Sequence, residues 1–202
     1  MTALLPLAAA ALALERSGQA LALLAGSWSA GAARWRPEPG RWSALEVVNH
    51  LADEEKHDFR LRFCLLIDSP LSAWPRTDPQ GWVTQRGYNG RDLLTSIERF
   101  GSERATSLSQ LREMPEPDWS TRRGSLSALD LMASWQAHDL LHLRQLSELR
   151  YLWLESQDMN IEYAGEWPGL VRPSEHGTGH EQGQHKEQQL ATHPAAGALE
   201  PS

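Results

Sequence analysis

The chain has 202 residues, of which 41% are hydrophobic and 22% charged, and its formal net charge is −7. This balance suits one globular domain with some additional length, and it excludes a fibre, an internal disulfide scaffold and a basic surface for nucleic acid. The only cysteine, Cys64, favours a reducing compartment, and we expect no run to be long enough to span a membrane. We therefore expect a cytoplasmic protein with no nucleic-acid or membrane partner.

The first helix is expected over residues 3–25, where alanine and leucine recur in "ALLPLAAAALALERSGQALALLAG". The start of this run has the length and composition of a signal-peptide core, but it lacks the positively charged segment that precedes one. Its helical spacing also continues past Arg16, so we interpret the run as the first helix of a bundle. The glycines and prolines of "AGSWSAGAARWRPEPGRWS" then predict a loop.

Three further helices follow in chain order. Ser43 precedes Glu46 by three positions, which is the spacing of a capping box, and the helix that it starts is expected to reach about Asp68. Three prolines and three glycines predict an irregular connection over residues 69–90, and a third helix fits residues 91–114. Ser127 offers the last N-terminal cap, at the start of a helix over residues 128–154.

Four amphipathic helices without a two-residue alternation predict an all-α fold, a four-helix bundle. The connection between the second and third helices is long enough to run the length of the bundle. We expect the bundle domain to occupy residues 1–160, a C-terminal extension residues 161–172, and a disordered tail residues 173–202, which has little to bury. The tail contains four scattered histidines, His176, His180, His185 and His193.

The last helix contains two histidines, His138 and His142, in "SWQAHDLLHLRQLSEL". Residues four positions apart lie on one face of a helix, one turn apart, which is a chelating geometry. Neutral imidazoles on an apolar face need hydrogen-bond partners or a cation. The intervening residues include no glutamate after the first histidine, so the HExxH arrangement of zinc proteases is excluded.

The second helix contains two more histidines, His50 and His57, either of which supplies a third nitrogen by this reasoning alone. Three histidines with an open position form the usual layout of a catalytic divalent-metal site in a bundle. Glu54, one turn after His50, is the best-placed carboxylate for a general base. Trp135, one turn before His138, is a candidate wall of the pocket.

The chain resembles the DinB-like family of small metal-binding helical bundles. The resemblance rests on "RPEPGRWSALEVVNHLADEE", "DPQGWVTQRGYNGRDLL" and "GSLSALDLMASWQAHDLLHLRQL", which occur in this order within residues 5–150. It implies up-down-down-up topology and metal ligands at His50, His138 and His142, whereas His57 matches no ligand of the family. It also implies that Asp53 and Glu55 are partners for the imidazole N–H groups.

The same resemblance implies a bound divalent metal, for which we expect zinc or nickel, with manganese or iron as alternatives. It points to a metal-dependent hydrolase, or to a transferase that uses a low-molecular-weight thiol, acting on a small molecule. The alternative is a non-catalytic bundle that metal stabilises, acting as a binding or stress-response module. A homodimer is compatible with either function.

Overall fold

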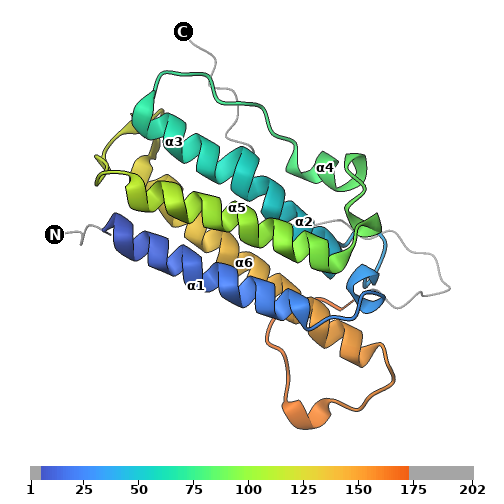
Figure 1. The fold of residues 1–202 in the computed structure, drawn as a ribbon. Helices are drawn as coiled ribbons and strands as arrows, with labels where there is room; N and C mark the ends of the chain where they lie inside the picture. Colours follow the sequence, from blue (N-terminus) through green and yellow to red (C-terminus); the bar gives the residue numbers. More distant parts are fainter. Residues whose placement is uncertain (1–5, 173–202) are drawn as a thin grey trace, which may run out of the picture.

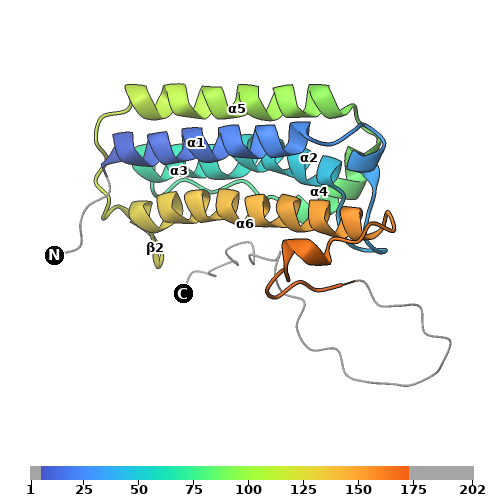
Figure 2. The ribbon, with the colours of Figure 1, turned by 90° about the horizontal axis from the view of Figure 1, so that it is seen from below.

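The computed structural model describes residues 6–172 as a helical bundle (Figures 1 and 2). Its long segments are α1 (Leu7–Gly26), α2 (Ala44–Glu54) with its continuation through η2 (Glu55–Phe59) and α3 (Arg60–Asp68), α5 (Leu93–Glu113) and α6 (Ala128–Glu155). Its short elements are η1 (Ala32–Arg34), α4 (Pro79–Gln85), η3 (Tyr88–Gly90), β1 (Arg122–Arg123), β2 (Leu126–Ser127) and η4 (Glu162–Ala164).

The helices follow up-down-down-up topology, as the resemblance implied. In Figure 1, α1 and α6 run in one direction, whereas α2 with α3, and α5, run in the other. Helix α1 packs against α5 and α6, α2 packs against α5, and α3 packs against α6. The long connection returns the chain along the bundle between α3 and α5, which allows two successive long segments to run parallel.

Two capping boxes start the helices that carry the histidines. The Ser43 hydroxyl accepts a hydrogen bond from the Glu46 backbone N–H at 3.2 Å, and the Glu46 carboxylate accepts one from the Ser43 N–H at 2.8 Å. Ser127 and Asp130 form the same reciprocal pair at the start of α6. Both caps satisfy backbone groups that a helix N-terminus leaves unpaired, which is why these starts were predictable.

The second helix differs from the expected regular run because η2 is a π-helical segment. A π-helix bonds each N–H to the carbonyl five residues back, so it contains one residue more than an α-helical turn does. The extra residue rotates the buried face of α3 relative to that of α2 by roughly 100°. Such segments are frequent at functional sites, and this one begins directly after Glu54.

The connection over residues 69–90 is less irregular than expected, since it contains α4 and η3. Asp78 caps α4 by accepting a hydrogen bond from the Gly81 N–H at 2.9 Å. Gly87 then takes a left-handed conformation, with φ of 58°, that favours glycine. The next residue, Tyr88, is fully buried and donates a hydrogen bond to Asp53 of α2, which fixes the connection against the bundle.

Helix α1 corrects the expectation about membrane-spanning length. Its 20 residues are long and apolar enough to cross a membrane when length and composition alone are considered. In the structure, one stripe of the helix, including Leu14 and Leu21, is buried in the bundle, while Leu12 and Leu23 on other faces are exposed.

The segment after α6 folds back beside that helix. Tyr151 and Trp167 bring their rings to 5.4 Å between centroids, and the Arg41 side chain donates a hydrogen bond to the Val171 carbonyl at 2.9 Å. The division at residues 160 and 161 stays a prediction, and the expected disordered tail lies outside the described residues.

The apolar core consists of two clusters, one toward each end of the bundle. One cluster includes Leu14, Phe63 and Trp135, and the other includes Leu21, Phe100 and Leu146. Between them along the helices lie buried polar side chains: Asp53, Glu54, Glu55, Arg104, Asp139 and the histidines His50 and His142. We call this set, together with the adjoining His138, the polar layer.

Arg104 of α5 holds the polar layer together, although it is only 4% exposed. Its guanidinium donates two hydrogen bonds of 2.9 Å to Glu55 and two of 2.6 and 2.8 Å to Asp139. It also donates to the Leu14 carbonyl of α1 at 2.6 Å. Gly18 leaves room for the arginine, because a Cβ there would lie 3.1 Å from the Arg104 Cγ. One side chain therefore joins α1, η2, α5 and α6.

Replacing Arg104 with methionine should lower the free energy of unfolding by about 3–5 kcal/mol, because it leaves two buried carboxylates without their partner. Urea unfolding followed by circular dichroism measures the change. The matched control is Arg112→Met, which breaks a pair with Glu15 whose side chains are 56% and 32% exposed, and should cost less than about 1 kcal/mol. Equal losses in the two variants would contradict this role of Arg104.

Candidate metal centre

Helix α6 presents His138 and His142 on one face, as their spacing predicted. Their ring centroids lie 4.4 Å apart, and their Nε2 atoms are separated by 3.1 Å. His142 is 7% exposed, whereas His138 is half-buried. The pair therefore extends from the polar layer toward solvent.

His50 of α2 completes the cluster. Its Nε2 atom lies 3.3 Å from that of His138, and its ring centroid lies 4.8 Å from that of His142. One ligand atom from each of the three histidines lies within 4.8 Å of the others, and this is the only such His, Cys, Asp or Glu cluster among residues 6–172. The structure thus brings together the three positions that the resemblance implied.

Aromatic side chains enclose the cluster. The Trp42 ring packs on His50 at 4.8 Å, and the Phe59 ring packs on His138 at 4.9 Å. Trp42 holds this place because it directly precedes the cap residue Ser43, and Phe59 because it ends the π-helical segment. These two rings form the aromatic walls beside His50 and His138.

The two buried histidines are neutral at pH 7. Burial lowers the pKa of His142 to about 4, and burial together with the nearby His142 lowers the pKa of His50 well below its usual range. His142 Nδ1 lies 2.7 Å from the Gln145 side-chain oxygen, which can only accept, so Nδ1 carries the proton. The Nε2 atom of His142 therefore presents a lone pair to its neighbours.

These features fit a cation. Nitrogens with lone pairs that face one another at 3.1–3.3 Å repel unless a proton or a metal ion lies between them. The Gln145 oxygen orients His142 as an outer partner orients a metal-bound imidazole. His50 Nδ1 is buried and has no hydrogen-bond partner among the described residues, so no partner of that kind orients the second ring.

The carboxylates that the resemblance implied as imidazole partners lie elsewhere. Asp53 accepts hydrogen bonds from Tyr88 and Arg99 and forms an ion pair with Arg86. Glu55 pairs with Arg104 and accepts a hydrogen bond from Trp135 Nε1 at 3.1 Å. Both carboxylates therefore join α2 and η2 to neighbouring elements of the bundle. Their positions in the sequence did not predict these partners.

Two other expected residues also have positions outside the cluster. Trp135 is 1% exposed and stacks on Phe59 with ring centroids 5.9 Å apart, so it belongs to the core and not to the pocket wall. His57 lies edge-on to Trp82 at 5.7 Å and is not one of the clustered histidines. The geometry therefore favours His50 over His57 as the third nitrogen.

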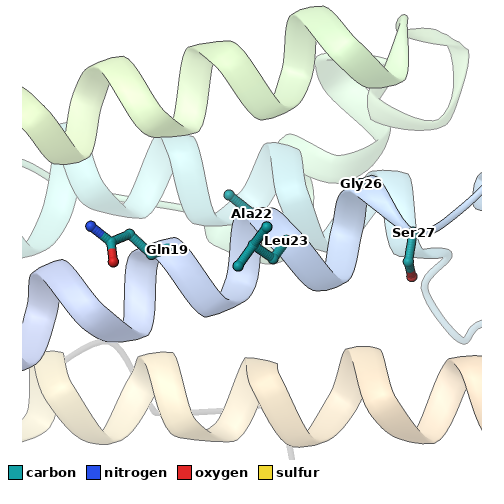
Figure 3. Close-up of a pocket in the computed structure, with 5 residues that line it drawn as sticks. All are labelled: Gln19, Ala22, Leu23, Gly26 and Ser27. Atoms are coloured by element: carbon teal, nitrogen blue, oxygen red, sulfur yellow. The ribbon is translucent and has the colours of Figure 1, made fainter.

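A hollow elsewhere on the surface offers no comparable chemistry. Figure 3 shows it on α1, lined by Gln19, Ala22, Leu23, Gly26 and Ser27. None of these residues titrates or is a common metal ligand, and none belongs to the polar layer.

The family of the chain follows from its sequence. The family model described as the DinB superfamily matches residues 13–146, and the chain therefore belongs to that superfamily. No curated protein sequence matches it. Among solved structures, it resembles YfiT from Bacillus subtilis, described as a probable metal-dependent hydrolase with an unusual four-helix bundle topology. The TM-score is 0.61 and the identity 17%, over 70% of this chain and 84% of that chain, which shows a shared fold.

Alanine at His50, His138 or His142 should each remove tight binding of one divalent ion, because two nitrogens leave an incomplete site. Elemental analysis and zinc titration of the full chain, each variant beside the wild type, measure this change. Because the tail histidines are present in every sample, loosely bound metal cancels in the difference. His57→Ala is the matched control and should retain the ion. Loss of the ion in His57→Ala, or retention of the ion in the other three variants, would contradict the assignment of the three ligands.

The low pKa of His142 predicts a dependence of stability on pH. The unfolded chain binds a proton to this residue near pH 6.5, and the folded chain only near pH 4, so stability falls as the pH drops through this interval. In His142→Gln this loss disappears. When the pH falls from 7 to 4, the free energy of unfolding of the metal-free wild type should drop by up to about 3 kcal/mol more than that of the variant, as measured by urea unfolding. Parallel curves would show that His142 titrates normally.

Proposed function

We propose that this protein is a divalent-metal-dependent hydrolase of a small molecule, with His50, His138 and His142 as the metal ligands. The observation that carries the proposal is the convergence of three Nε2 atoms, 3.3 Å apart between His50 and His138 and 3.1 Å apart between His138 and His142, in a site where burial keeps His50 and His142 neutral. Neutral imidazole is the form that binds a metal.

The comparisons support the same function. Membership of the DinB superfamily fits a metal-binding bundle, and YfiT, which shares the fold, is described as a probable metal-dependent hydrolase. A set of three imidazoles suits zinc or nickel, with manganese or iron as alternatives.

A divalent ion held there would polarise a substrate oxygen and make a nearby water more acidic, which is the basis of metal-assisted hydrolysis. The protein contributes ligands in fixed positions and aromatic walls at Trp42 and Phe59. Because His138 is the least buried of the three, a substrate approaches from its side. The tight packing of the other two suits a small molecule.

Two alternatives are separated by the same experiment. Transfer of a low-molecular-weight thiol uses the same metal chemistry and differs in the nucleophile, and a non-catalytic bundle uses the ion for stability alone. Location in the cytoplasm and assembly into a homodimer stay predictions.

The zinc- and nickel-loaded full chain should hydrolyse an activated ester such as 4-nitrophenyl acetate. The rate should fall by about tenfold or more when EDTA removes the metal and when His138 is replaced by alanine, while His57→Ala leaves it unchanged. The absorbance of the released nitrophenol measures the rate of hydrolysis. Thiol-dependent loss of 1-chloro-2,4-dinitrobenzene without ester hydrolysis would instead indicate a transferase. Bound metal with neither activity would indicate the non-catalytic bundle.

A further inference from the structure

Glu54 shares the polar layer with the candidate metal centre without belonging to the ligand cluster. It is the last residue of α2, one helical turn after His50, and 40° round the helix from it. Both His50 and Phe59 contact the His138 ring, with centroid separations of 5.4 and 4.9 Å. Because Glu54 lies between His50 and Phe59 on the same helical segment, its position along the bundle axis is level with that of His138.

Glu54 is buried without the partners that its neighbours have. It is 6% exposed, and its Oε1 atom has no hydrogen-bond partner among the described residues. The adjacent carboxylates Asp53 and Glu55 both pair with arginines. An unpaired buried carboxyl oxygen costs free energy, so its retention points to a role other than stability.

Burial and the charges around Glu54 bring its pKa close to neutral pH. Burial, with the nearby Asp58 and Asp53, raises the pKa of Glu54 to about 8, and Arg62 opposes the shift. A divalent ion on the histidines would lower that pKa, because an opposite charge favours the carboxylate. Burial thus raises the pKa of Glu54 and a bound ion would lower it, which suits a group that gains and loses a proton near neutral pH.

We propose that Glu54 is the general base of the hydrolysis at the three-histidine site, an inference that rests on the proposed function. The carboxylate accepts a proton from the attacking water as the water oxygen bonds to the electrophilic atom of the substrate. The same proton then passes to the leaving group as its bond to that atom breaks. Water is consumed, and Glu54 returns to its starting charge.

Side chains one and two turns after Glu54 link this helix to the long connection. Arg62 contacts Asp58 at 3.1 Å and donates to the Thr77 hydroxyl at 3.0 Å, and that hydroxyl donates to Asp58 at 3.2 Å. Arg62 also lies over the Trp74 ring at 5.1 Å. Asp58 and Arg62, whose charges act on Glu54, are thus held in place beneath the connection.

The first test counts protons and needs no substrate. Zinc binding to the wild-type full chain at pH 7 should release about one proton more than binding to Glu54→Gln, because the ion converts the buried carboxylic acid to carboxylate. Titration calorimetry in buffers of different ionisation enthalpy gives the count. Glutamine is neutral and of the same size, so the variant should fold and retain one ion. Glu103→Gln, which changes a carboxylate paired with Lys56 and Arg60, is the control and should match the wild type.

The second test uses the ester that the wild type hydrolyses. Glu54→Gln should lower kcat by about a hundredfold with KM nearly unchanged and remove the acidic limb of the pH profile, and Glu54→Asp should recover part of the rate. Equal proton release, or an unchanged kcat in the metal-loaded variant, would overturn the role of Glu54 and leave the metal site intact. Absence of tightly bound metal in the wild type would overturn the proposed function itself.

Discussion

One buried arginine sets the geometry on which the candidate site depends. Arg104 reaches Glu55 on one side and Asp139 on the other, and these two residues directly follow Glu54 and His138 in the sequence. Fixing Glu55 opposite Asp139 fixes the depth of α2 relative to α6, and so it brings His50 level with His138 and His142. Bidentate pairing adds a directional constraint that apolar packing lacks, since apolar side chains tolerate a shift of one helix along another.

The polar layer also explains why the bundle divides its core in two. Apolar side chains fill both ends, and Arg104, its carboxylate partners Glu55 and Asp139 and the three histidines lie in the middle. Within that layer, Arg104 is hydrogen-bonded to both Glu55 and Asp139. His50 Nδ1 and Glu54 Oε1, in contrast, are buried and have no hydrogen-bond partner among the described residues. The first arrangement stabilises the fold, and the second costs free energy, as is usual for groups kept for binding or chemistry.

Local signals made much of this structure predictable. Ser43 and Ser127 marked helix starts because capping needs a side-chain oxygen at one position, and the spacing of His138 and His142 gave their shared face directly. The choice between His50 and His57 needed the family resemblance, because the sequence carries no measure of helix depth. The partners of Asp53 and Glu55 escaped prediction for a related reason, because Arg99 and Arg104 lie 46 and 49 residues away from them in the chain. The π-helical segment also escaped prediction.

The position of α1 has a consequence for how the chain folds during synthesis. This helix packs on α5 and α6 and barely contacts α2, its neighbour in sequence. Its apolar stripe is made before α5 and α6 and finds its partners only after these two helices have left the ribosome. Ribosomes add about 5–20 residues per second, so the stripe stays uncovered for several seconds. Docking of α1 closes long loops, so it is a late folding step with high contact order, and the apolar stripe is open to aggregation until then.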